Sequence, residues 1–206
     1  MDWLLQQFIN GLALGFIYAL VALGYTMVYG ILRFINFAHS DVLMLGAFSA
    51  YFLAPALQKT GSPVSIVSAF LIVVLAALIC AIIGMLIEFL AYRPLRQRPR
   101  LTVLITAIGV SLFIEFTGQH KAVFGANTKP FPQLLPESTV QLGNVSMQSN
   151  DIIISLVTML LLAGLWLVIQ RTRTGMAMRA VSFNEKAAAL MGVNINRIIS
   201  FTFGLG

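Results

Sequence analysis

The chain has 206 residues, of which 59% are hydrophobic and only 10% are charged, and its formal net charge is +6. Soluble domains carry about a quarter charged residues, so this composition excludes a soluble globular protein and indicates an integral membrane protein. The single cysteine, Cys80, excludes an internal disulfide framework. The Lys and Arg residues lie mainly in two short connections between apolar runs, so we attribute the positive charge to membrane topology and not to nucleic-acid binding.

The apolar runs predict an all-α fold, a polytopic transmembrane helical bundle with about five complete spans and the start of a sixth. A helix needs about 20 apolar residues to cross the hydrocarbon layer. The predicted spans are 3–32, 42–58, 64–87, 101–117 and 152–170, and the sixth begins at 198. Because the last run is too short to cross, we expect 1–206 to be a fragment of a longer single transmembrane domain.

The first run, 3–32, carries no charge and places small residues on one helical face. Such a face allows a second helix to approach closely in lipid, and ordinary helix packing is the interpretation we favour for it. Asn10 and Tyr18 add polar side chains and are candidates for lining a pathway. The small residues are Gly11, Gly15, Ala19, Ala22 and Thr26.

Arg33, Asn36, His39 and Asp41 are concentrated between the first and second runs. One interpretation is a solvated turn on the cytoplasmic side. The other is a non-helical segment that enters the protein interior, where polar groups can face a pathway. Both remain open from the sequence. His39 is a weak candidate for a metal ligand, because the only other histidine, His120, is far along the chain.

The connections between the later runs give one consistent topology. Four arginines within 93–100 indicate a cytoplasmic loop, and Glu88 is expected to pair with Arg93 or Arg96. Alternation then places the 59–63 turn outside. The polar segment 118–150 also lies outside, as an external loop with a small hairpin around Gly143.

The segment 171–197 is the second basic connection, and it is predicted to be cytoplasmic. It carries five basic residues and one acid, Glu185. Ala177, Val181, Ala188 and Met191 recur at helical spacing, which predicts a short amphipathic helix or a pair of helices. Gly175 opens this segment, and Gly192 is placed like the glycine that follows a helix end.

Several separated motifs resemble one known family. The stretch 10–30, NGLALGFIYALVALGYTMVYG, resembles the first span of the permease subunits of branched-chain amino-acid ABC importers, the LivH family. Ile35-Asn-Phe-Ala-His39 resembles the most recognisable motif of that family, and 92–96 and 175–197 match as well. The sequence departs from the family at Ser40 and Asp41, where Gly and Glu are usual. It also departs at Lys186, where the docking motif has Glu.

The resemblance implies a permease that translocates branched-chain amino acids, or a related small polar solute such as urea or an amide, across the bacterial inner membrane. It implies a second homologous permease, two cytoplasmic ATP-binding subunits and a periplasmic or lipid-anchored substrate-binding protein as partners, besides membrane lipid, and no cofactor. The chain itself would be no enzyme, because its partners hydrolyse ATP. The resemblance places ATPase coupling at Gly175, Arg179, Asn184, Glu185, Ala187, Ala188 and Gly192. The candidate pathway residues are Asn10, Tyr18, Asn36, His39 and Asp41.

Two other classes of function are weighed against this one. A stand-alone channel or secondary transporter would need ionisable residues near mid-membrane to couple an ion, and the candidates Glu88 and Glu115 lie near span ends. An intramembrane enzyme would need a deep catalytic pair, and only His39 and Asp41 are close in sequence. The chain has no phosphate-binding loop of the G-x-x-x-x-G-K-[ST] type.

Overall fold

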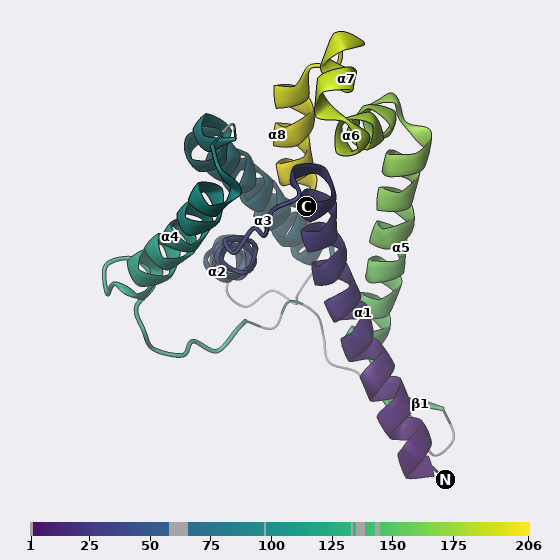
Figure 1. Ribbon diagram of the computed structural model, residues 1–206. Coiled ribbons are helices and arrows are strands. Elements are labelled where there is room, and N and C mark those ends of the chain that lie inside the picture. Colours follow the sequence, from purple (N-terminus) through teal and green to yellow (C-terminus); the bar gives the residue numbers. More distant parts are fainter. Residues whose placement is uncertain (1, 58–65, 97, 133, 135–138, 143–144) are drawn as a thin grey trace.

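A computed structural model describes residues 2–57, 66–96, 98–132, 134, 139–142 and 145–206. Helices dominate these residues, and one antiparallel pair of short strands joins them (Figure 1). The elements in chain order are α1 (Asp2–Leu32), α2 (His39–Leu57), α3 (Ile66–Ile87), η1 (Glu88–Tyr92), η2 (Arg93–Leu95), α4 (Arg100–Gln119), β1 (Thr139–Leu142), β2 (Val145–Gln148), α5 (Ser149–Arg171), α6 (Arg173–Phe183), α7 (Glu185–Leu190) and α8 (Ile195–Leu205).

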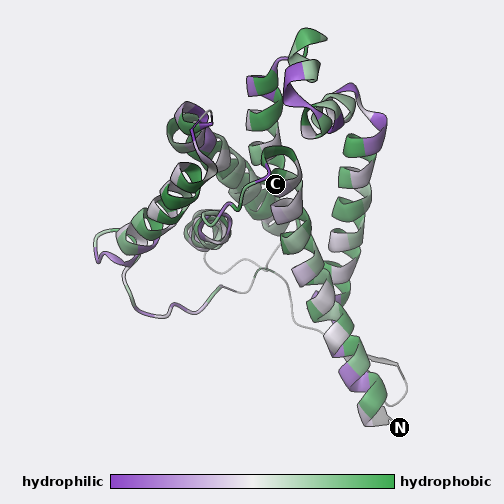
Figure 2. Ribbon diagram, viewed as in Figure 1, coloured by the Kyte–Doolittle hydropathy of each residue, from purple (hydrophilic) through white to green (hydrophobic). Residues whose placement is uncertain are grey.

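Within the described residues, five helical segments are long and apolar enough to cross a membrane. They are α1, α2, α3 with its η1–η2 extension, α4 and α5. Their shafts are mostly hydrophobic, while hydrophilic residues gather at the α5–α6 corner and on α7 (Figure 2). Large apolar side chains such as Phe70, Phe113 and Leu160 are exposed, which suits helices that face lipid. The predicted all-α, polytopic helical bundle is confirmed.

The third span extends further than the sequence predicts. α3 continues through a π-helical turn, Glu88–Tyr92, and a 3₁₀ turn, Arg93–Leu95. Pro94 does not stop this extension, because it lies at the start of the 3₁₀ turn. Proline is tolerated there because the first residues of a helical turn have no intrahelical partner for their N–H groups. The second span, α2, begins at His39, three residues before the predicted start.

The core lies where α8 packs against α1, the end of α3 and α4. Its buried side chains are Val28, Tyr92, Val103, Ala107, Ile199 and Phe203. α8 approaches α3 closely at Gly84, where an added Cβ would lie 2.7 Å from the carbonyl oxygen of Phe203. One face of the last described helix, with Ile199, Thr202 and Phe203, is therefore buried in the bundle.

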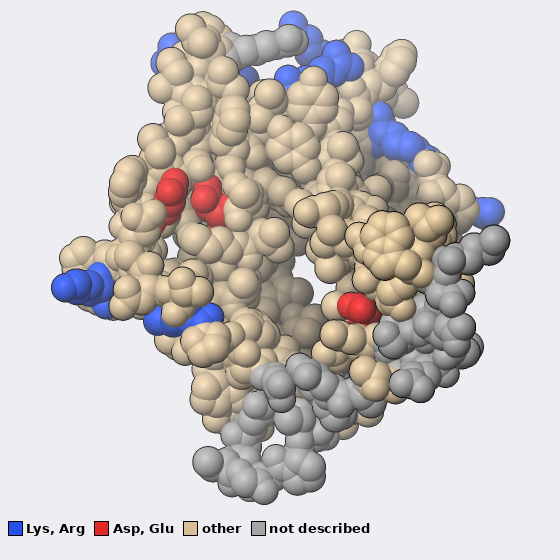
Figure 3. Space-filling view, turned by 90° about the horizontal axis from the view of Figure 1, so that it is seen from below, with Lys and Arg blue, Asp and Glu red and all other residues tan. Residues whose placement is uncertain are grey.

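Both basic connections lie at one end of the bundle. In Figure 1, the α3–α4 connection and α6–α7 are at the top, and the N-terminus and the strands β1 and β2 are at the lower end. Seen from below, uncharged residues dominate, and Lys and Arg side chains gather toward the edges (Figure 3). This arrangement places the two basic connections on one side, as the alternation of spans predicts.

The segment between α4 and α5 carries the short strands at its far end. β1 and β2 pair antiparallel, with Leu142 opposite Val145 and Thr139 opposite Gln148. The predicted hairpin tip, Gly143-Asn144, lies outside the described residues, as does the predicted 59–63 turn. Earlier in the same segment, the ring of Phe124 stacks on that of Phe48, with 4.2 Å between centroids, so this loop packs against α2.

Candidate functional site

The basic segment 171–197 folds into two short helices and the start of a third, and each helix begins at a side-chain cap. Thr172 accepts from the N–H of Gly175, Asn184 from that of Ala187, and Asn194 from that of Arg197. Ser, Thr and Asn at these positions satisfy N–H groups that have no intrahelical partner. The chain therefore encodes the starts of α6, α7 and α8 locally.

α7 ends in a Schellman motif. Gly192 has a φ of +84°, and its N–H donates to the Ala189 carbonyl, while that of Val193 donates to the Ala188 carbonyl. Glycine adopts this left-handed conformation without the steric cost of a Cβ. The predicted role of Gly192 in ending the helix is confirmed.

The corner between α5 and α6 depends on Gly175 and Arg179. A Cβ at Gly175 would lie closer than 3.0 Å to the carbonyl oxygens of Val168 and Ile169. The Arg179 guanidinium donates to the Ile169 carbonyl at 2.8 Å and to the Gln170 side-chain oxygen at 2.6 Å. A cation that bonds the last carbonyls of a helix stabilises the negative end of its dipole. Both predicted residues therefore position α6 on α5.

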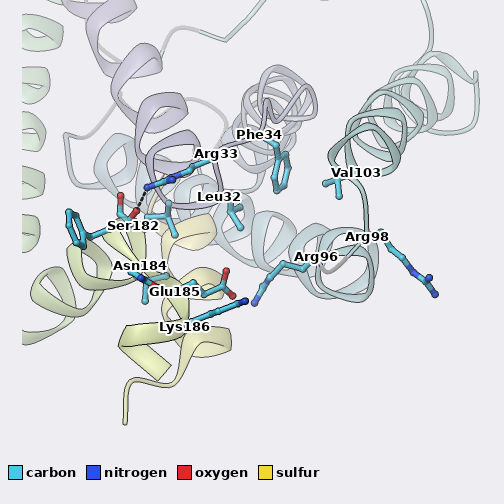
Figure 4. A pocket seen from close by; sticks show the side chains of 13 residues that line it. Leu32, Arg33, Phe34, Arg96, Arg98, Val103, Ser182, Asn184, Glu185 and Lys186 are labelled. Atoms are coloured by element: carbon cyan, nitrogen blue, oxygen red, sulfur yellow. Dashed lines mark hydrogen bonds between the residues drawn. The ribbon is translucent and has the colours of Figure 1, made fainter. Parts of the chain in front are cut away.

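α6 is also fastened to the end of α1. The Arg33 guanidinium donates to the Ser182 carbonyl at 2.9 Å (Figure 4), and the Ser182 hydroxyl donates to the Gly30 carbonyl at 2.6 Å. Arg33 has a φ of +56°, which is uncommon outside glycine. Met178 and Val181 bury the inner face of α6. The segment that joins α1 to α2 therefore supports the basic segment.

Three large apolar side chains project from the ends of α6 and α7 and from the residue that follows α7. Phe183 is 88% exposed, Leu190 89% and Met191 85%, and we call these three residues the apolar apex. The helical spacing of Val181, Ala188 and Met191 predicted a short amphipathic helix or a pair of helices, and the chain forms the pair, α6 and α7, with a break at Asn184. Val181 and Ala188 are buried, whereas Met191, which follows the end of α7, is exposed. The sequence signal that could have identified Phe183 and Leu190 is their position close to the buried residues of α6 and α7.

Two of the remaining predicted coupling residues, Asn184 and Glu185, line a cavity of about 500 Å³, whereas Ala187 and Ala188 do not. The cavity lies between the end of α1, the α3–α4 connection and α6–α7. Figure 4 shows Arg33 pointing at Ser182, Arg96 pointing towards Glu185 and Lys186, and Arg98 pointing away. The cavity wall therefore combines apolar side chains with several basic ones and one acid, Glu185.

One side of the segment 33–38 is buried in the bundle, and the other side is exposed. Asn36 is only 7% exposed, and its side-chain oxygen accepts from the Tyr92 hydroxyl at 2.7 Å. The ring of Phe34 also packs edge-on against Tyr92, with 5.3 Å between centroids. This burial favours the second of the two open interpretations, a segment that enters the protein interior, over a solvated turn.

Of the five candidate pathway residues, Asn36 and His39 meet at one cavity. This cavity, of about 340 Å³, lies between α1, α2, α3 and α8 and is mostly apolar, with Cys80 in its wall. Asp41 is buried but does not line it. Asn10 and Tyr18 are exposed on α1, away from the cavity. The structure therefore brings together Asn36 and His39, and it separates them from the other three candidate pathway residues.

Glu88 is the most deeply buried charged residue of the site, with 0% exposure. One carboxylate oxygen accepts from Arg96 Nη2 at 2.5 Å, and the other accepts from the Ser200 hydroxyl at 2.6 Å. The predicted Glu88–Arg96 pair is confirmed. The described residues contain no group of three or more His, Cys, Asp or Glu that could hold a metal ion.

Comparisons with known proteins agree on one family. A family model described as branched-chain amino acid transport system / permease component matches residues 7–206. The chain is 40% identical to the high-affinity branched-chain amino acid transport system permease protein BraD of Pseudomonas aeruginosa, over 98% of this chain and 66% of that protein. It is 36% identical to the LivH proteins of Salmonella typhimurium and Escherichia coli K12, over 99% of this chain and 67% of each. The chain thus spans about two thirds of the length of these relatives, and no solved structure matches it.

Proposed function

Because the chain belongs to the family of branched-chain amino acid transport system permease components and sits in the bacterial inner membrane, we propose that it is a permease subunit of an ABC importer. It translocates branched-chain amino acids while partner subunits hydrolyse ATP. The curated relatives are named for branched-chain amino acid transport. The chain is assigned the membrane passage and the docking of the ATPase, and no ATP chemistry of its own.

The observation that carries this proposal is the apolar apex at the basic end of the bundle. Exposed large apolar groups that gather outside the lipid-facing shafts mark protein interaction sites. Phe183, Leu190 and Met191 project from α6–α7, while the opposite face is fastened to α1 and α5 through Arg33 and Arg179. A short helix pair that is rigidly held on one side and exposed on the other suits transmission of force from a soluble subunit.

A second homologous permease is proposed as the partner in the membrane. The five small residues of the α1 face are all exposed, and a Cβ at Gly11 or Gly15 would meet nothing within 4 Å. Faces of this kind allow close helix packing in lipid, where van der Waals contacts drive association. A periplasmic or lipid-anchored binding protein would deliver the amino acid at the opposite end of the bundle from the apolar apex.

Replacing Leu190 and Met191 together by aspartate is expected to weaken ATPase binding at least about tenfold and to abolish ATP-dependent uptake. Both side chains are exposed, so the change removes apolar contact area without a cavity, and buried interface anchors contribute about 2 kcal/mol or more. The measurement is co-purification of the ATP-binding subunits, with uptake of radiolabelled leucine. Phe131→Asp, an exposed apolar residue before the β-strands, is the matched control. If the Leu190→Asp/Met191→Asp variant still bound the ATP-binding subunits, the apolar apex would not be their docking site.

The orientation of the chain is tested by thiol labelling in a Cys80→Ser background, because Cys80 is the only cysteine. A cysteine at Lys121, in the loop after α4, is expected to react with a membrane-impermeant maleimide from the periplasmic side. A cysteine at Arg98 is expected to react only after the inner membrane is opened. The basic connections favour the cytoplasm because Lys and Arg are retained there. The reverse pattern would overturn the topology and move the apolar apex away from any ATPase.

A further inference from the structure

We propose that the ion pair of the buried Glu88 and the partly buried Arg96 is the positioning link through which a movement of α6–α7 reaches α3. The inference rests on the proposed function, because it says how a docked ATPase would act on the membrane helices. Glu88 and Arg96 do not belong to the apolar apex, and they do not line the cavity that contains Asn36 and His39.

The pair is bonded to two consecutive turns of α8. Arg96 Nη1 donates to the side-chain oxygen of Asn196 at 2.9 Å, while the Ser200 hydroxyl donates to Glu88. Asn196 and Ser200 are four residues apart, so they lie on one face of the helix. Arg96 and Glu88 in turn bond each other from the two ends of the η1–η2 extension of α3. One ion pair therefore sets the position of α8 along α3.

α8 is closely connected to the proposed docking segment. Only residues 191–194 separate the end of α7 from the start of α8, and this connection is fixed by the left-handed Gly192 and the Asn194 cap. α6 and α7 also contact α8 directly. A displacement of α7 therefore moves α8, and the Glu88–Arg96 pair is where that movement meets α3.

Stability alone does not account for a charged pair at this position. Replacing a buried ion pair by apolar residues of similar volume is often neutral or stabilising. The pair instead holds α8 in one position and orientation relative to α3, because hydrogen bonds weaken steeply when their geometry is lost. Glu88 lies in a π-helical turn, a feature that is frequent at functional sites. Arg96 lines the 500 Å³ cavity and also a second cavity, beside Arg93 and Asn196, so its guanidinium has space to leave the carboxylate for a hydrated position.

The inference predicts that coupling and stability respond differently to substitution. Glu88→Gln keeps the shape and an oxygen for Ser200 but removes the charge that holds Arg96. We expect it to lower the ratio of leucine imported to ATP hydrolysed at least threefold, with the ATP-binding subunits still bound. Glu88→Met/Arg96→Met is expected to unfold at the temperature of the unaltered transporter, or above it, and yet to show the same low ratio.

The experiment uses the complete transporter in proteoliposomes, with both rates measured on one preparation. Glu115→Gln is the matched control, because Glu115 is exposed on α4 and its carboxylate accepts only from Gln119, at 3.3 Å, among the described contacts. Its ratio is expected to stay unchanged. A normal ratio in the double methionine variant would overturn the inference and make the pair structural, even if Glu88→Gln failed to assemble. ATP-independent uptake by the unaltered transporter would overturn the proposed function, and this inference with it.

Discussion

Alanine at Gly175 is expected to reduce ATP-dependent uptake at least about tenfold while membrane insertion stays unchanged. The added Cβ would collide with the carbonyl oxygens of Val168 and Ile169, which are backbone atoms and cannot turn aside. Overpacking of this kind costs about 1–3 kcal/mol, and about 1.4 kcal/mol corresponds to a tenfold change in an equilibrium. The corner would open, and α6 would lose its bonds from Arg179 to the end of α5.

The control for this substitution lies in the same helix. Gly164 is also in α5, but a Cβ there would meet nothing within 4 Å, so Gly164→Ala is expected to transport normally. Uptake of radiolabelled leucine and co-purification of the ATP-binding subunits are measured on membranes that contain equal amounts of each variant. Equal uptake by the two alanine variants would show that the close α5–α6 corner has no part in coupling.

Leucine at Asn36 is expected to give the second large effect, a several-fold loss of uptake with normal assembly of the subunits. The change leaves the buried Tyr92 hydroxyl without its acceptor at 2.7 Å, and an unsatisfied buried polar group costs about 1–3 kcal/mol. It also removes one of the polar groups of the cavity that contains His39. The segment 33–38 would then lose its attachment to the end of α3.

The double variant Asn36→Leu/Tyr92→Phe separates anchoring from a direct role in the pathway. Removing both partners of a hydrogen bond is nearly neutral for stability, whereas removing one is not. If Asn36 faces the solute, uptake stays low in the double variant although its thermal stability recovers. Recovery of uptake together with stability would leave Asn36 with an anchoring role only. Asn10→Leu serves as the control, because Asn10 is exposed and its side chain bonds only Gln6 among the described contacts.

Together these experiments test one connected path. In the proposed path the apolar apex would receive the ATPase, the α5–α6 corner and Arg33 hold α6 in place, and the Glu88–Arg96 pair joins α8 to α3. The end of α3 then meets the interior segment through Tyr92 and Asn36. Movement at the basic end would reach the pathway cavity along this series of bonded contacts.

The sequence was most informative where the signal is local. Charge-free runs predicted the spans, because each backbone group in lipid must be satisfied within its own helix. Thr172, Asn184 and Asn194 cap helices, and Gly192 ends one, since both devices need only a few neighbouring residues. The charge pattern placed the two basic connections at one end of the bundle.

Only the tertiary structure decided which residues of the predicted sites belong together. It joined Asn36 to Tyr92 and Arg33 to Ser182, pairs that are 56 and 149 residues apart, and it left Asn10 and Tyr18 exposed on α1. It also decided between one helix and a pair of helices over 171–197, and it gave the pair a buried face and an exposed apolar apex. The physical reason is that helix formation depends on neighbours along the chain, whereas burial depends on how the finished helices pack, which no short-range pattern records.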